Sequence, residues 1–350
     1  MSKKIGIIGI RGLPANYGAF DTFVDQFVKD KSVINSQIFF IISSNKKKFD
    51  KKSQYSNVKQ VFVPGLSGPL ILFNYFIAII MMLINGVRVF LFFGYGAAIF
   101  FSFLKLFNCK IICNPDGIEW RRPNNFIKKQ YFKICETIFA KIKISKIYDS
   151  EVIKRYYKVK YKSDGKTIYY PSKFEDCIDL ARRENKVKRF YILGRLLKEN
   201  NVSLIVNTFK RLNNCKLFII GYKSKFFKKI ILPSIKNSKN IFYVGEIYNK
   251  KELLNYLSFF DYYIHGHKAG GTNPTLIEAI NLKKKIFAYD CSFNREILGK
   301  KNVYFKNDLE LENLIKYYDD FEYEENVYKK SFTQNFINKE YLEILLNEFK

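Results

Sequence analysis

The chain has 350 residues, of which 48% are hydrophobic, and its 60 Lys and Arg outnumber its 32 Asp and Glu to give a net charge of +28. A single hydrophobic core seldom grows beyond about 250–300 residues, so we expect two domains. The charge calls for an anionic partner, which can be nucleic acid, anionic lipid or a phosphorylated small molecule. The sequence has no zinc finger, RRM signature or basic region with heptads, which disfavours nucleic acid.

The amino-terminal segment and the cysteines bear on the compartment. Residues 5–10 form a short apolar run that lacks the length and cleavage site of a signal peptide, so we expect a cytoplasmic protein. The cysteines include no CxxC pair and no histidine at ligand spacing, which disfavours disulfides and a zinc site. We expect buried free thiols at Cys109, Cys113, Cys135, Cys177, Cys215 and Cys291.

Short apolar runs alternate with amphipathic stretches, a pattern typical of parallel strands joined by crossover helices. In the first half we expect strands at residues 4–10, 37–43, 58–63, 89–93, 110–114, 143–148 and 167–170. In the second half we expect them at residues 189–193, 216–221, 241–244, 262–265, 285–289 and 303–305. The prediction is an α/β chain of two Rossmann-like, doubly wound parallel-sheet domains. Turn-forming residues between 160 and 176 separate domain 1–168 from domain 169–334, and a final helix at 335–350 can pack on either.

Residues 70–84 read LILFNYFIAIIMMLI, in which only Asn74 is polar. A bilayer span needs about 18 or more apolar residues, so we favour a buried or membrane-dipping helix over a transmembrane one. Lysine runs at residues 45–52 and 223–229 fit a solvated surface and a membrane-facing surface equally well. Together these features would suit an enzyme that sits on a membrane surface.

The first predicted strand leads into the loop IGIIGIRGLPANYGAFDTF. Its glycines, the last of which is Gly18, allow backbone amides to approach a phosphate at the start of a helix expected near Asp21. The loop is longer than the dinucleotide fingerprint G-x-G-x-x-G, and the second strand is not followed by the usual acidic residue. A nicotinamide enzyme is therefore a secondary alternative, and glycines that only form a tight turn are another.

A later predicted strand is followed by CNPDGIEWRR, residues 113–122. Ligands of open α/β sheets bind beyond the carboxyl ends of the strands, which is where we expect this loop. Asp116 and Glu119 are candidates to bind sugar hydroxyls or to act as a catalytic base. Trp120, the only tryptophan, fits a role in this site and a role as a core or interface anchor equally well.

In the second half, Gly194 and Arg195 end a predicted strand, and Lys198 follows. An arginine there can bind a diphosphate bidentately and neutralise the charge that grows on a leaving group.

The stretch HGHKAGGTNPTLIEAI passes from a strand end through a glycine turn into a helix. Amides at such a helix start suit a phosphate, and a carboxylate one turn in can accept two ribose hydroxyls. An H-x-H pair without a further His or Cys is a weak metal site, so we favour contact with a sugar hydroxyl or a backbone carbonyl. The candidate donor-site residues here are His265, His267, Gly270, Gly271, Thr272, Asn273, Thr275 and Glu278.

Together these motifs resemble the GT-B glycosyltransferases of family 4. More narrowly, GIRGLPANYGAFDTFV, NPDGIEW, GRLLKENN and HGHKAGGTNPTLIEA resemble the bacterial rhamnosyltransferase-like subgroup that builds capsule and O-antigen units. The resemblance implies two domains facing a central cleft, and retaining transfer from a nucleotide sugar, TDP-L-rhamnose above all, without metal or other cofactor. The implied acceptor is a polyprenyl-diphosphate-linked glycan, with the enzyme peripheral on the anionic inner face of the cell membrane.

The resemblance also assigns roles to single residues. Arg195 is implied to bind the donor diphosphate, and Glu278 to hold the ribose. Gly18 would lie under a phosphate at the first helix, and the amides of residues 271–275 would contact the pyrophosphate and the sugar.

The sequence departs from the family pattern at three places. The usual first glutamate is Gly270, the usual second glycine near the first helix is Ala19, and the usual lysine after the arginine is Asn200. The missing glutamate fits a deoxy sugar, and Lys198 can replace the missing lysine. A UDP-hexose or GDP-mannose donor stays open, as does a non-catalytic basic protein that binds membranes or polyanions on a GT-B scaffold.

Overall fold

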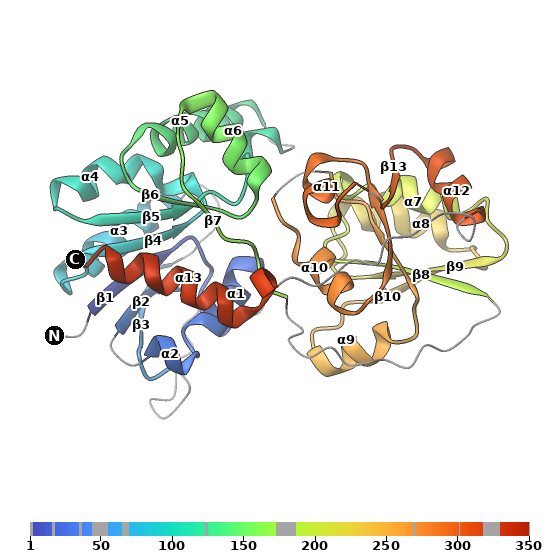
Figure 1. Ribbon diagram of the computed structural model, residues 1–350, viewed down its shortest axis with the longest axis horizontal. Coiled ribbons are helices and arrows are strands. Elements are labelled where there is room, and N and C mark those ends of the chain that lie inside the picture. Colours follow the sequence, from blue (N-terminus) through green and yellow to red (C-terminus); the bar gives the residue numbers. More distant parts are fainter. Residues whose placement is uncertain are drawn as a thin grey trace. The chain divides into compact units, whose positions relative to one another are not determined.

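The computed structural model describes residues 3–15, 18–34, 37–43, 55–64, 70–122, 125–172, 187–268, 271–300, 302–317 and 330–349. The chain forms two compact units, residues 1–171 with 330–350, and residues 172–329. Each unit is a parallel sheet with helices on both faces (Figure 1). The predicted fold class, two doubly wound parallel-sheet domains, is therefore confirmed.

The first unit contains a seven-stranded parallel sheet in the order β3-β2-β1-β4-β5-β6-β7. Its strands are β1 (Lys3–Ile8), β2 (Gln37–Ser43), β3 (Val58–Phe62), β4 (Val89–Phe93), β5 (Lys110–Asn114), β6 (Ser145–Tyr148) and β7 (Lys166–Thr167). The bounds of β2, β4 and β5 are those predicted, because each is an apolar run that is buried on both faces. Strand β7 is shorter than predicted and lies at the sheet edge, where a single neighbour supplies its hydrogen bonds.

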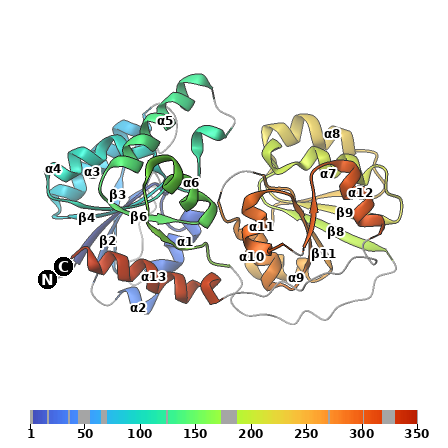
Figure 2. The same ribbon diagram turned by 45° about the horizontal axis from the view of Figure 1, so that its top comes forward.

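Helices cover both faces of this sheet. They are α1 (Ala19–Phe27), α2 (Lys31–Ile34), α3 (Ile71–Ile84), η1 (Tyr95–Phe100), α4 (Phe101–Leu106), η2 (Glu119–Arg121), α5 (Phe126–Lys141), α6 (Glu151–Tyr161), η6 (Lys330–Phe332) and α13 (Gln334–Asn347). Figure 2 shows α13 and α1 on one face, and α3, α4 and α5 on the other.

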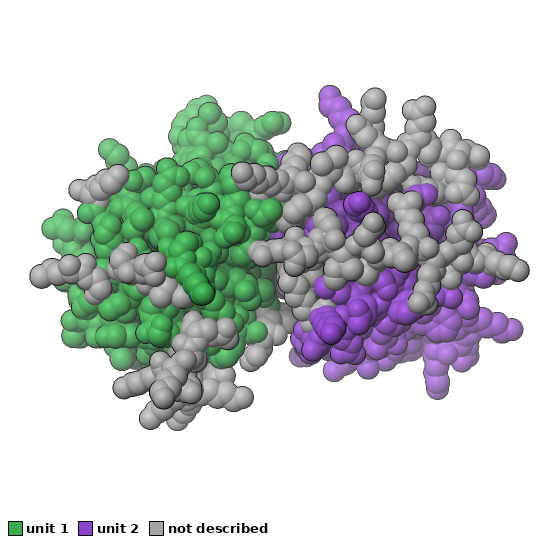
Figure 3. All heavy atoms as spheres, turned by 60° about the horizontal axis from the view of Figure 1, so that its bottom comes forward, with its two compact units in different colours: residues 1–171, 330–350 green, residues 172–329 purple. Residues whose placement is uncertain are grey.

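The last helix of the chain belongs to the first unit, which Figure 3 colours green, and its inner residues are part of that unit's core. Ile5 and Ile7 of β1 point to the same face, as alternate strand residues do, and they share a buried cluster with α1 and α13. The ring of Tyr341 in α13 lies 4.7 Å from that of Phe23 in α1. On the opposite face, α3 approaches β1 so closely that a Cβ on Gly6 would lie 2.9 Å from the sulfur of Met82.

The second unit contains a six-stranded parallel sheet in the order β10-β9-β8-β11-β12-β13. Its strands are β8 (Lys188–Leu193), β9 (Cys215–Ile220), β10 (Ile241–Gly245), β11 (Tyr262–His265), β12 (Lys285–Tyr289) and β13 (Val303–Phe305). Its helices are η3 (Lys198–Asn200), α7 (Val202–Phe209), η4 (Phe227–Ile231), α8 (Leu232–Ile235), α9 (Lys250–Leu257), α10 (Pro274–Asn281), α11 (Ser292–Leu298) and α12 (Asp308–Lys316). Helices α7, α8 and α12 pack on one face through a single buried cluster.

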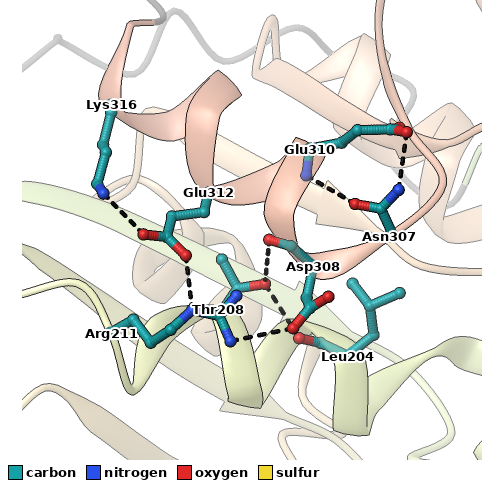
Figure 4. Close-up of polar contacts among 8 residues, drawn as sticks. All are labelled: Leu204, Thr208, Arg211, Asn307, Asp308, Glu310, Glu312 and Lys316. Atoms are coloured by element: carbon teal, nitrogen blue, oxygen red, sulfur yellow. Dashed lines mark hydrogen bonds and ion pairs between the residues drawn. The ribbon is translucent and has the colours of Figure 1, made fainter.

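An ion-pair network holds α12 against the end of α7 (Figure 4). Arg211 lies 3.0 Å from Asp308 and 2.6 Å from Glu312, and Glu312 also pairs with Lys316 at 2.7 Å. The hydroxyl of Thr208 donates to the backbone carbonyl of Asp308 at 3.2 Å. Exposed pairs contribute little singly, so the network mainly sets the orientation of a helix that the core already holds.

The structure bears on the predictions for the apolar segment at residues 70–84 and for the cysteines. Helix α3 has 14 residues, and none of the described helices combines the length and apolar content needed to cross a bilayer. The cysteines within the described ranges are free thiols, whereas Cys177 and residues 173–176 of the predicted domain joint lie outside the described residues.

The packing of α13 predicts that Leu345→Ala weakens the first unit. Leu345 is fully buried in the cluster with α1 and β1, so the cavity should lower the free energy of unfolding by about 2–5 kcal/mol. Urea unfolding followed by circular dichroism measures this change. The control is Asn347→Ala, whose side chain is exposed two residues further on, and equal stability of the two variants would contradict the prediction.

Candidate functional site

Each sheet has one place where the direction of strand addition reverses, between β1 and β4 in the first unit and between β8 and β11 in the second. Connections leave such a point to opposite sides, so a crevice opens at the carboxyl ends of the two strands. In the second unit a small recess lies there. It is lined by Arg195, Asn200, Gly266 and His267 and by apolar side chains of β8, α7 and β11.

The loop after β8 carries the two basic residues predicted for the donor diphosphate. Gly194 has a φ of 127°, which glycine adopts without strain, and the Arg195 and Lys198 side chains that follow are exposed. Asn200, in contrast, is buried, and its amide donates to the carbonyl oxygen of Arg195. Asn201 donates to the carbonyl oxygen of Gly266 at 2.9 Å. Asn200 therefore braces the loop, and Lys198 is its second exposed cation.

A chain of buried and partly buried hydrogen bonds joins β11 to the first turn of α10. Asn273 caps the helix: its Oδ1 accepts the Thr275 N–H at 3.0 Å and the Thr275 hydroxyl at 2.8 Å. The Thr275 oxygen lies 2.8 Å from the Tyr263 hydroxyl, which lies 2.9 Å from Nδ1 of His265. Because Thr275 donates to Asn273, it must accept from Tyr263, and Tyr263 must then accept from His265. This relay holds His265 as the tautomer protonated at Nδ1.

His265 and His267 form a stacked pair at the recess, with ring centroids 4.8 Å apart and planes 14° from parallel. Burial lowers the pKa of His265 well below its usual value, and the neighbouring His267 adds to the shift, so His265 is neutral at physiological pH. Its Nε2 has no hydrogen-bond partner within the described part of the chain. A Cβ placed on Gly194 would lie 4.0 Å from the His267 ring. His267 thus lines the recess beside the turn after β8, with the buried His265 stacked behind it.

Glu278 lies one turn into α10 and is 2% exposed. Burial raises the pKa of both Tyr191 and Tyr263, and the negative charge of Glu278 adds to each shift. The carboxylate therefore lies near these two tyrosines. Of the turn that precedes α10, Thr272 is buried and Gly271 partly buried, whereas Gly270 lies outside the described residues.

The loop after β1 contains a buried carboxylate, Asp21, in the first turn of α1. It is 7% exposed and accepts the backbone N–H of Arg11 at 2.7 Å. Burial raises the pKa of Asp21, and the amide and charge of Arg11 oppose that shift. Gly18 precedes α1 with a φ of 109°, and a Cβ there would lie 2.6 Å from the Asp21 carboxylate. An anion at this helix start would meet a negative charge, whereas a ligand hydroxyl could donate to it.

The loop after β5 places both predicted carboxylates on one arginine. Nε of Arg122 lies 3.1 Å from Glu119, and its Nη2 lies 3.4 Å from Asp116. Asp116 has a φ of 65° and its N–H donates to the Asn114 side chain at 3.1 Å. The Glu119 N–H donates to the Tyr95 hydroxyl at 2.7 Å. Both carboxylates stay partly exposed, so each retains lone pairs that can accept a ligand hydroxyl.

Trp120 anchors this loop to the helices behind it. Its indole N–H donates to Oε2 of Glu136 at 2.8 Å, and the Glu136 side chain is fully buried. Oε1 of Glu136 accepts from Tyr156 and Tyr161 at 2.7 Å and pairs with Lys160 at 2.9 Å. These donors replace the water that the buried carboxylate has lost. The structure therefore supports the anchor role, one of the two considered for Trp120.

Solved structures share this two-unit fold along nearly the whole chain. A sucrose-phosphate synthase from Thermosynechococcus elongatus has 12% identity and a TM-score of 0.74, over 99% of this chain and 95% of that one. A glycosyltransferase from Rickettsia africae has 16% identity and a TM-score of 0.71, over 100% of this chain and 99% of that one. Anabaena HepE, solved with UDP-glucose, has 11% identity and a TM-score of 0.71, over 98% of this chain and 99% of that one. At such identities the likeness concerns the fold alone, and no curated protein matches the chain.

The family comparison bears on the chemistry. Residues 179–337 match the family described as glycosyl transferases group 1. The protein therefore has the GT-B fold, and its second unit carries a glycosyl transferases group 1 domain. Residues 2–173 of the chain match a domain of unknown function, DUF1972. The group 1 match supports the predicted class of enzyme, and the rhamnosyltransferase-like subgroup stays a prediction.

The sequence indicated which side chains follow the strands but not the partners that hold them. Tyr263 was within reach of prediction, because it precedes His265 by two residues and so shares its face of β11. Asp21 was noted only as the start of a helix. Glu136 carried no signal, since its partners come from η2 and α6 and meet it only in the folded protein.

Changing Tyr263 to phenylalanine should break the relay while keeping the packing of the ring. In protein labelled with ¹⁵N-histidine, the unchanged chain is expected to show His265 protonated at Nδ1 at neutral pH, and the variant a mixture of tautomers. The chain has only 2 histidines, so the spectrum is simple. Tyr262→Phe on the opposite face of β11 is the control. Finding His265 protonated at Nε2 in the unchanged protein would refute the direction of the relay.

Changing Glu136 to alanine should release Trp120. Loss of a buried acceptor that several donors share is expected to lower the free energy of unfolding by about 2–4 kcal/mol. Because Trp120 is the only tryptophan, its emission should move to longer wavelength as the indole gains water. The control is Ile134→Ala, on the same helix and 57% exposed. Unchanged emission and unchanged stability together would show that Glu136 is not the anchor.

Proposed function

We propose that this protein is a glycosyltransferase that moves L-rhamnose from TDP-L-rhamnose to a glycan on a polyprenyl diphosphate carrier, with retention of configuration and without a metal. The product would belong to a bacterial surface polysaccharide, O-antigen or capsule. The observation that carries the proposal is the crevice between β8 and β11, within the glycosyl transferases group 1 domain. Arg195 and His267 line this crevice. The start of α10 is nearby, since a Cβ on Gly194 would lie 3.9 Å from the Thr275 side chain.

The donor diphosphate would lie between Arg195 and the amides of residues 271–275. Both positions favour a dianion, since the guanidinium is exposed and the start of α10 carries the positive end of the helix dipole. Lys198 would supply the second positive charge, because Asn200 is turned inward. Glu278 would accept hydrogen bonds from the ribose hydroxyls.

Rhamnose is the favoured sugar because GIRGLPANYGAFDTFV, NPDGIEW, GRLLKENN and HGHKAGGTNPTLIEA resemble the rhamnosyltransferase-like subgroup. Gly270 in place of the usual glutamate removes an acceptor for a sugar hydroxyl, which suits a deoxy sugar. A UDP-hexose is the second candidate, because HepE, which shares the fold, was solved with UDP-glucose. GDP-mannose is a third donor to be tested.

Transfer would proceed without a protein nucleophile. The bond between the anomeric carbon and the diphosphate oxygen breaks first, and its electron pair stays on the diphosphate, where Arg195 and the turn amides stabilise the charge. The acceptor hydroxyl oxygen then bonds to the anomeric carbon on the same face, and its proton passes to the departing phosphate oxygen. Asp116 and Glu119, both paired with Arg122, would bind acceptor hydroxyls rather than take that proton.

The site predicts that Arg195→Ala reduces transfer by about 10²–10³-fold, because it removes charge stabilisation that grows as the leaving group departs. Glu278→Ala should mainly raise KM for the nucleotide sugar. Lys210→Ala, an exposed cation after α7 that does not line the recess, is the matched control. Saturation-transfer NMR with TDP-rhamnose, UDP-glucose, UDP-galactose, UDP-N-acetylglucosamine and GDP-mannose identifies the donor, and radiolabelled transfer measures the rates.

Selective contact with TDP-rhamnose that is lost in Glu278→Ala would support the rhamnosyl proposal. Selective contact with another donor would keep the reaction and change the sugar. If the protein binds none of the nucleotide sugars, the weight moves to a non-catalytic protein that binds membranes or polyanions.

A further inference from the structure

Helix α3 is apolar on its solvent side as well as on its sheet side. Its inner residues are buried against the sheet and include Ala78, Ile79, Met82 and Leu83. Its outer side exposes Phe73 and Ile84 by 61% and 79%. A surface helix usually carries polar residues on its outer face. The outer stripe of α3 therefore serves no purpose in the core of the first unit.

The exposed stripe continues onto α4. The ring of Phe76 lies 5.7 Å from that of Phe103, which lies 4.9 Å from that of Phe107. Leu106, in the last turn of α4, is 82% exposed. Figures 1 and 2 show α3 and α4 on the same face of the sheet. We call this surface the α3–α4 face, made of Leu70, Phe73, Phe76, Met81, Ile84, Leu106 and Phe107. Exposed apolar groups gathered in this way indicate an interaction surface.

The chain segment that carries the face has charges of one sign. Residues 51–115, which include the whole face, contain no Asp or Glu. Arg88 is exposed just beyond α3 and donates to the carbonyl oxygens of Leu83 and Val87, at 3.1 and 2.8 Å. Lys105 lies in the last turn of α4, and the exposed Lys110 begins β5. The apolar face thus has cations and no acidic residue in its own segment.

This combination selects one kind of partner. Aromatic and aliphatic side chains next to lysine and arginine suit an anionic lipid surface, where the apolar groups enter the headgroup region and the cations meet phosphates. A second copy of the chain fits less well, because the cations of two copies would approach one another.

We propose that the α3–α4 face docks this protein on an anionic phospholipid bilayer, with Phe73, Ile84 and Leu106 inserted at the headgroup level. Docking along the surface agrees with the 14-residue length of α3. The purpose of docking rests on the proposed function, since a polyprenyl-linked acceptor lies in such a bilayer, whereas the binding itself does not require transfer.

Co-sedimentation with vesicles tests the proposal. The full chain is mixed with vesicles of phosphatidylglycerol and phosphatidylcholine, or of phosphatidylcholine alone. We expect binding to the anionic vesicles that salt weakens. The double variant Phe73→Ser with Leu106→Ser should lose about tenfold or more in affinity, because two apolar side chains no longer enter the lipid. Lys105→Glu is a second variant that leaves the apolar groups in place and should also bind less.

The matched control is Ile230→Ser with Leu309→Ser in the second unit, where both side chains are similarly exposed, at 57% and 64%. It should bind vesicles as the unchanged protein does. Thermal unfolding and sedimentation velocity verify that each variant is folded and report its assembly state.

Three results would overturn the proposal. The unchanged protein could ignore anionic vesicles, the double variant could bind as well as the control, or the face could prove to hold two copies together in solution. Nucleotide-sugar binding, measured by NMR without lipid, keeps the two proposals apart. If the protein binds anionic vesicles but binds no sugar nucleotide, the docking proposal stands and the proposed function is refuted.

Discussion

The parallel direction of every strand is the constraint on which the candidate sites depend. Because all strands of a sheet run the same way, their carboxyl ends share one edge, and every chain segment that leaves a strand there is brought to the same place. In the second unit this brings Arg195 and His267 to one recess, although 71 residues separate them and β9 and β10 intervene. In the first unit the same rule brings the loops of Asp21 and Asp116 to one edge. The chemistry then depends on which side chains the loops present.

Buried polar groups do the work of holding those loops in shape. Glu136 holds Trp120 and thereby the acidic loop, Asn200 and Asn201 hold the turn after β8, and the relay from Asn273 to His265 joins α10 to β11. Each arrangement satisfies groups that would be costly to bury alone. Preorganised loops of this kind suit a reaction whose catalysis consists of binding and charge stabilisation rather than of a covalent step.

The surface of the protein is also divided by task. The crevice of the second unit exposes cations that fit a diphosphate, whereas the α3–α4 face of the first unit exposes apolar side chains in a segment without acidic residues. We propose two partners for the high net charge, a nucleotide sugar at the crevice and an anionic bilayer at the α3–α4 face. The net charge alone does not distinguish these two partners, whereas the location of the charged and apolar residues does.

The sequence by itself determined the strands, the glycine turns and the exposed basic residues, because alternating apolar runs and turn-forming residues act locally. The bounds of β2, β4, β5, β11, β12 and β13 follow from such runs. Only the tertiary structure decided which polar side chains turn inward. Asn200 stands where the family pattern has a lysine, but its side chain turns inward and braces the loop after β8. Tyr341, near the end of the chain, packs on Phe23, near its start. These contacts join residues that are far apart in sequence or differ only in which way they point, and the local pattern carries no information about either.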